Sequence, residues 1–188
     1  MDRIIGAFTF RSGVYADVEQ DSSFTSTAWL IVAVVSLLNQ LGSRTFDTFG
    51  NWLLGAIVGT IFAVLGFALA TYIINLVGRV VFKADVNFNE LLRTVGLAYV
   101  WQVVGFLGIV GAFSVALQCI VSPALVIGVI LWLVASFIAA KEALDLEWLQ
   151  TIITVFLGWL AYMVVLALTG IVLSAIGIGG AALFGSLF

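Results

Sequence analysis

The chain has 188 residues, of which 63% are hydrophobic and only 9% are charged, and its net charge is −3. A water-soluble domain usually has about 25% charged residues, so this composition excludes an ordinary soluble enzyme or binding domain. The sequence also has no basic patch and no aromatic RNA-binding signature, and we expect no nucleic-acid partner.

The charged residues lie between long apolar runs. No Asp, Glu, Lys or Arg occurs in the 47 residues from Thr94 to Ala140, or in the 41 residues from Trp148 to Phe188. Such continuous apolar runs are typical of membrane helices. We therefore predict an all-α polytopic membrane protein, a bundle of five transmembrane helices (residues 24–188) preceded by a short interfacial segment (residues 1–23).

The N-terminal segment has an amphipathic pattern. Ile4, Ile5 and Phe8 share one helical face, and Arg3 and Arg11 are placed to meet anionic headgroups. This pattern favours a weak interfacial helix, and an arm that docks a partner is the alternative interpretation. The mixed charge of the segment is not typical of a cleaved signal peptide.

The first two spans follow the N-terminal segment. A helix needs about 20 residues to cross a hydrocarbon core. We predict the first span over residues 24–41, with Asp21 or Ser22 as its cap. Residues 42–50 form a short loop, and residues 52–76 form the second span.

The polar stretch from Arg79 to Arg93 returns the chain to water. Within it, Asn87 and Glu90 have the spacing of a capping box, which predicts a helix that begins near Phe88. The third span then covers residues 94–111.

The fourth span is predicted from its proline. Pro is favoured at the first position of a helix and Ser just before it, so Ser122 and Pro123 place the span at residues 123–140. These 18 residues would rise about 27 Å, which is just enough to cross. Residues 112–121 are an uncharged connector that either continues the preceding helix or lies on the membrane surface.

The hydrophilic turn from Lys141 to Glu147 comes next. Asp145 is placed to cap the fifth span, which we predict over residues 148–176. A sixth span, split at Thr169 and Gly170, is the alternative. We favour five spans because no polar turn separates the two halves of this run.

The orientation follows from the basic residues. With five spans, one side of the membrane carries six of the seven cations and the other side carries Arg44 alone. Cytoplasmic loops carry the excess of Lys and Arg, so we predict the N-terminus inside and the C-terminus outside. The six cations on the inner side are Arg3, Arg11, Arg79, Lys83, Arg93 and Lys141.

Three segments, in this order and spacing, resemble the prokaryotic branch of the Rab/Ypt-interacting (YIP) membrane-domain family. They are IIGAFTFRSGVYADVEQDSSFTSTAWLIV, FNELLRTVGLAYVWQVVG and AAKEALDL. The resemblance implies a five-helix integral membrane domain with a cytoplasmic N-terminus, here in a prokaryotic cytoplasmic (inner) membrane.

The eukaryotic members of that family are adaptors of vesicle traffic that bind small GTPases and each other, whereas the prokaryotic members have no settled activity. One departure from the family pattern is visible. Trp101 stands after Tyr99 and Val100, where family members often have Pro, and we expect a straighter third helix here.

No residue pattern points to catalysis. The chain has no histidine, and its single cysteine, Cys119, lies in an apolar run. Every carboxylate lies in a loop or at a helix end, so the spans offer no acid pair or ion site. We expect neither an enzyme nor a bound metal or cofactor.

Two sets of residues are candidates for other roles. Small residues let membrane helices approach closely; they form a stripe on the second span that serves either packing inside the bundle or self-association. This stripe is Gly55, Gly59, Gly66 and Ala70.

The second set is polar and lies on the inner side. It either snorkels to lipid headgroups or forms a cluster in which Glu90 or Glu142 pairs with Arg79 or Arg93 and locks the second, third and fourth helices. The whole set is Tyr72, Asn75, Arg79, Glu90, Arg93 and Glu142.

These observations leave two functional hypotheses. The first is a non-catalytic adaptor or scaffold of YIP type, possible also as an accessory subunit of a larger membrane complex. The second is a small oligomeric transporter or channel, suggested by the many glycines and by Asn75, Gln102 and Gln118. In both, the expected partners are the lipid bilayer and another membrane protein or a second copy of this chain.

Overall fold

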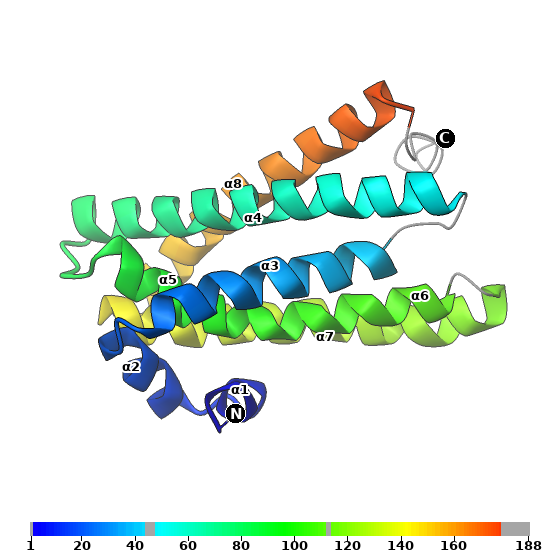
Figure 1. Cartoon of the computed structure of the whole chain (residues 1–188). Coiled ribbons are helices and arrows are strands. Elements are labelled where there is room, and N and C mark those ends of the chain that lie inside the picture. The colour runs from blue at the N-terminus through cyan, green and yellow to red at the C-terminus, as the bar shows by residue number, and fades with distance from the viewer. Residues whose placement is uncertain (1, 44–47, 112–113, 178–188) are drawn as a thin grey trace.

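The computed structural model describes residues 2–43, 48–111 and 114–177, which form two short helices followed by five long helical rods (Figure 1). The third rod contains three consecutive helical segments. In chain order the elements are α1 Asp2–Phe8, α2 Ser12–Gln20, α3 Phe24–Gly42, α4 Phe49–Val80, α5 Phe88–Ala98, η1 Tyr99–Leu107, α6 Gly108–Gly111, α7 Val115–Leu144 and α8 Trp148–Ala175.

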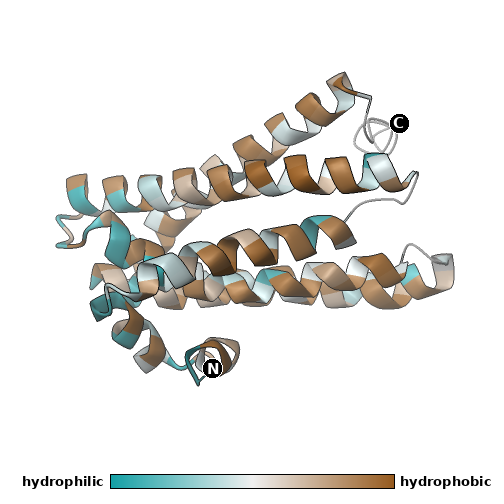
Figure 2. Cartoon of the chain, in the orientation of Figure 1, coloured by the Kyte–Doolittle hydropathy of each residue, from teal (hydrophilic) through white to brown (hydrophobic). Residues whose placement is uncertain are grey.

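Each of the five rods is long and apolar enough to cross a membrane, which confirms the all-α, five-span fold. The rods alternate in direction. The hydrophilic residues gather at one end of the bundle, around α2, the loop between α4 and α5, and the start of α8 (Figure 2). We call this end the polar end. The chain enters the first rod from the polar end and leaves the fifth rod at the opposite end (Figure 1).

The exposed and buried faces of α4 carry side chains of different size. Its exposed face carries large aliphatic residues, among them Leu53, Ile57, Ile61, Leu65 and Leu69. Its buried face is built mainly from glycine and alanine at Gly55, Ala56, Gly59, Ala63 and Gly66. Large apolar side chains on the outer face suit contact with lipid. Small residues on the inner face let the helices pack closely, and this packing is the main attraction between membrane helices.

The small-residue face of α4 packs inside the chain, and its most extensive interface is with α8. A Cβ added to Gly66 would lie 3.0 Å from Tyr162 Cδ2 on α8. On the other side of this interface, a Cβ on Gly158 would lie 2.5 Å from Ile74 Cγ1 and 3.0 Å from the carbonyl oxygen of Ala70. A side chain at Gly158 would therefore collide with the Ile74 side chain and press on the α4 backbone.

The third rod changes to 3₁₀ geometry over Tyr99–Leu107, where we expected a straight helix. This segment lies against the end of α3. The Asn39 amide donates to the Gln102 backbone carbonyl and to Gln102 Oε1, both at 2.9 Å. A Cβ on Gly42 would overlap the backbone of Gly105, so glycine is required for this close approach.

The predicted start of the fourth span at Pro123 is wrong. The helix α7 begins at Val115, where the Ser114 side chain accepts a hydrogen bond from the Leu117 amide at 3.2 Å. Pro123 lies inside this helix. Membrane helices tolerate an internal proline because nearby hydroxyls and neighbouring helices relieve the disturbed backbone, and here Ser122 donates to the Gln118 carbonyl at 2.8 Å. Residues 112–113 of the predicted connector lie outside the described residues.

Two helix caps also differ from the prediction. Asp145 is the last cap of α7, with a left-handed backbone (φ 49°), and Glu147 is the first cap of α8. Ser23, rather than Asp21 or Ser22, is the N-cap of α3. A cap is set by the backbone conformation of its residue, and several neighbouring polar residues fit the same sequence pattern equally well.

We expect Gly158→Ala to destabilise the protein by about 1–3 kcal/mol, because the new methyl group would displace the Ile74 side chain and crowd the Ala70 carbonyl. Thermal unfolding in detergent measures this loss. Gly50→Ala is the matched control, since nothing lies within 4 Å of a Cβ at Gly50. An equal response of the two variants would contradict the close α4–α8 packing.

Candidate functional site

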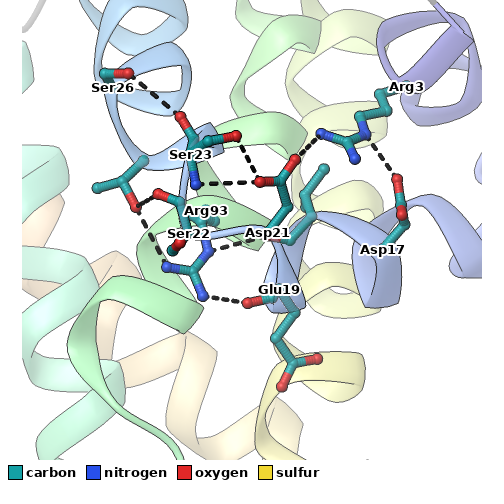
Figure 3. A network of polar contacts seen from close by, with 10 residues as sticks. Arg3, Asp17, Glu19, Asp21, Ser22, Ser23, Ser26 and Arg93 are labelled. Carbon is teal, nitrogen blue, oxygen red and sulfur yellow. Dashed lines mark hydrogen bonds and ion pairs between the residues drawn. The ribbon is translucent and has the colours of Figure 1, made fainter.

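Arg93 on α5 is the centre of the polar end and is almost fully buried, with 6% of its surface exposed. Its Nε donates to the Val18 carbonyl at 2.9 Å and its Nη1 to Thr25 Oγ1 at 3.2 Å. Its Nη2 donates to the Glu19 carbonyl (Figure 3). The guanidinium therefore joins α5 to the end of α2 and the start of α3.

This arrangement follows from the physics of helix ends. The last carbonyls of a helix have no partner within it and carry the negative end of its dipole. Val18 and Glu19 lie in the last turn of α2. Arg93 supplies a cation and several hydrogen-bond donors at this point, so burial of its charge is offset by the α2 carbonyls and the Thr25 hydroxyl.

Arg3 fastens the other side of the N-terminal segment. Its Nε lies 2.6 Å from Asp17 and its Nη1 lies 2.7 Å from Asp21. Asp21 also accepts hydrogen bonds from the Ser23 hydroxyl at 2.6 Å and the Ser23 amide at 3.1 Å (Figure 3). The Ser23 hydroxyl, followed by the Arg3 guanidinium, lowers the pKa of Asp21.

Apolar contacts complete the attachment of the N-terminal segment. Tyr15 and Val18 of α2 are fully buried. Phe8 and Phe10 pack on Trp101 of the third rod, with ring centroids 5.0 and 5.4 Å apart. The segment that we expected to lie on the membrane as a weak helix is thus two helices packed on the bundle.

An open cavity of about 640 Å³ lies beside Arg93, and we call it the cup. Glu19 stands at its edge. Burial, followed by the neighbouring charges of Asp145 and Glu90, raises the pKa of Glu19, and Arg93 partly opposes this rise. The cup is lined by Glu19, Gln20, Ser22, Asn87, Phe88, Asn89, Glu90 and Arg93.

The polar residues that we predicted as one cluster are divided in the structure. Glu90 forms the expected capping box with Asn87, which confirms the helix start at Phe88. Both ion pairs between described side chains involve Arg3, so the proposed pairing of Glu90 or Glu142 with Arg79 or Arg93 is wrong. Arg93 bonds main-chain carbonyls instead, because α2 brings them closer than any carboxylate.

The remaining members of that cluster have separate environments. Asn75 is buried and donates to the Val86 carbonyl at 3.3 Å, which holds the loop between α4 and α5. Tyr72 and Arg79 are exposed on the outer face of α4. Glu142 is half-buried, and its charge adds to the rise in the pKa of Glu19.

Sequence reasoning missed the role of Arg3 and the contacts of α2. Arg3 lies 14 and 18 positions from its two acidic partners, and Arg93 lies 75 positions from Val18. These sequence separations are much larger than the three or four residues that separate neighbours on one helical face. The apolar Val14, Tyr15 and Val18 recur at helical spacing in α2, and this pattern is a signal that could have suggested a docked helix.

The described residues contain no group of three His, Cys, Asp or Glu side chains that could hold a metal ion. Glu19 and Glu90 line the cup together with Arg93, and Glu142 and Asp145 lie close enough to Glu19 for their charges to raise its pKa. No family model, curated protein or solved structure matches the chain.

We expect Arg93→Gln to release α2 from the bundle at a cost of about 3 kcal/mol, because charge-assisted hydrogen bonds to the α2 carbonyls are lost. Amide hydrogen exchange should then accelerate across Ser12–Gln20. Arg79→Gln is the matched control, since Arg79 is exposed and forms no ion pair with another described residue. Unchanged protection of α2 in the Arg93 variant would contradict its role.

The raised pKa of Glu19 predicts a pH dependence. Folding favours the protonated carboxyl, so this group contributes stability below the ordinary pKa of about 4.3. The contribution is lost as the pH rises through the raised value. The protection factors of the α2 amides, which are corrected for the intrinsic pH dependence of exchange, should therefore rise as the pH is lowered from 7 toward the ordinary pKa of a glutamate, and the low pKa of Asp21 acts in the opposite direction only at lower pH.

Glu19→Gln mimics the protonated state and leaves the backbone carbonyl that Arg93 binds. It should raise the protection factors of α2 at pH 7 and flatten their change with pH. A fall of these protection factors when the original chain is acidified from pH 7, or an unaltered profile in the variant, would count against this account.

Proposed function

We propose that this chain is a non-catalytic adaptor or scaffold of YIP type in a prokaryotic cytoplasmic membrane, with its N-terminus inside and its C-terminus outside. The observation that carries the proposal is the preassembled polar end. Arg93 and Arg3 bond α2 to its neighbours, and the surface that results carries the open cup of about 640 Å³.

The charge of this surface suggests its partner. The described residues include nine acidic and six basic side chains, and all of them lie in the N-terminal segment, in the α4–α5 and α7–α8 loops or at the helix ends beside these loops. Arg3 and Arg93 are also occupied inside the chain. Cytoplasmic loops of membrane proteins are rich in Lys and Arg, so a basic loop of another membrane protein complements the cup.

The spans give little support to the alternative of an oligomeric transporter or channel. Transport of ions or protons generally uses ionisable groups at depth, and residues 94–140 and 148–188 contain no charged side chain. Asn75 and Gln102, which suggested a polar route, are used in hydrogen bonds near opposite ends of the bundle.

Copurification in mild detergent, followed by mass spectrometry, tests the proposal. We expect a membrane-protein companion whose recovery falls about tenfold when Glu19 and Glu90, the two acidic residues that line the cup, are replaced together by glutamine. Replacement of Asp2 and Asp85 by asparagine is the control, because these residues do not line the cup and should leave recovery unchanged.

Solute flux in proteoliposomes separates the two hypotheses. An adaptor should give no flux above that of empty vesicles. A protein that purifies alone and conducts solute would contradict the adaptor and support the transporter.

A further inference from the structure

A small cavity lies in the middle of the bundle, between α4, the third rod, α7 and α8. Its volume is about 30 Å³. Most of its wall is aromatic and aliphatic, but six lining residues carry a polar atom: Thr71, Tyr99, Trp132, Ser136, Trp159 and Tyr162.

Four of these polar atoms lack a hydrogen-bond partner among the described residues. They are Thr71 Oγ1, Trp132 Nε1, Ser136 Oγ and Trp159 Nε1, and each is buried. A buried polar group without a partner costs about 1–3 kcal/mol. Four such groups around one cavity therefore need a common explanation.

Thr71 differs from the other threonines of the spans. Thr60, Thr151, Thr154 and Thr169 each donate to the carbonyl four residues earlier, at 2.7–3.1 Å. This bond is available to any helical threonine, yet Thr71 does not form it. Its hydroxyl is free for a partner in the cavity.

A chain of hydroxyl groups also ends at the cavity. Ser36 donates to the Tyr99 hydroxyl at 3.1 Å, and the Tyr99 and Tyr162 hydroxyls lie 3.1 Å apart. Either tyrosine can be the donor of the bond between them, and this bond uses only one of their two protons. The other proton has no acceptor among the described residues and is available to the cavity, which both tyrosines line.

These groups define the chemistry of the ligand. Both indole nitrogens can only donate, so the ligand must accept hydrogen bonds. It must be neutral, because none of the lining residues is charged and none could balance an ion. Cavities for organic ligands measure about 300 Å³ or more, whereas one water molecule needs about 10–15 Å³.

We propose that this cavity is a built-in binding site for about two water molecules. They accept hydrogen bonds from Trp132, from Trp159 and from the tyrosine hydroxyl with the unused proton, and each can donate to, or accept from, the Thr71 and Ser136 hydroxyls. Because these residues come from α4, α7 and α8, the waters join three spans that share no direct side-chain hydrogen bond among these groups.

Radiolytic hydroxyl-radical labelling in detergent micelles tests the site directly, because radicals formed from bound water oxidise adjacent aromatic side chains. We expect oxidation of Trp132, although only 8% of its surface is exposed. The labelling should fall several-fold in the double variant Thr71→Val/Ser136→Ala. The double variant Thr154→Val/Thr169→Val removes two hydroxyls that are bonded within α8 and should leave it unchanged.

Trp101 is the internal reference, since it packs on Phe8 and Phe10 and does not line the cavity. Its labelling should be equal in all variants. An unlabelled Trp132, or equal labelling of Trp132 in both double variants, would overturn the proposal.

Thermal unfolding supplies a second measurement. Thr71 and Ser136 form no hydrogen bond with each other, so a dry cavity predicts additive shifts in Tm for Thr71→Val and Ser136→Ala, each neutral or upward. Shared water predicts that each single variant lowers Tm and that the second change costs less than the first. Additive shifts would overturn the proposal even if both variants fold well.

Discussion

The hydrocarbon core of a bilayer offers no hydrogen-bond partner to the backbone, and the rest of the structure depends on this constraint. Each span must satisfy its own amides, so the apolar runs form long helices. Lipid also removes the hydrophobic attraction between helices, so they associate by close packing. Two close approaches are the consequence, that of Gly158 to α4 and that of Gly42 to η1. At both positions a side chain would collide with the neighbouring helix.

The same constraint confines the charged side chains to the loops and the helix ends. Arg93 is a buried charge at the border of the third rod, and the α2 carbonyls that it binds come from a segment outside the spans. The N-terminal segment is therefore part of the fold, although it contains no membrane span. Its position also creates the cup, because Glu19 and Ser22 form one side and the start of α5 forms the other.

The sequence predicts the spans better than the site. Charge-free runs are long-range patterns that fix the number of helices, and the Asn87–Glu90 spacing fixes one helix start locally. The span start predicted from Pro123 is wrong because proline only prefers the first turn of a helix, and the surrounding apolar residues keep α7 helical on both sides of it. The partners of Arg93 depend on the path of a segment 75 residues away, and no local spacing contains that information.

Accessibility of single cysteines tests the five-pass arrangement most directly. In a chain with Cys119 replaced by alanine, cysteines at Gln20 and Asp85 mark the polar end, and cysteines at Gly50 and Ile176 mark the opposite end. A membrane-impermeant maleimide added outside intact cells should label only Gly50→Cys and Ile176→Cys, and labelling of Gln20→Cys and Asp85→Cys should require permeabilised cells. Labelling of Asp85→Cys and Ile176→Cys from the same side would contradict the account.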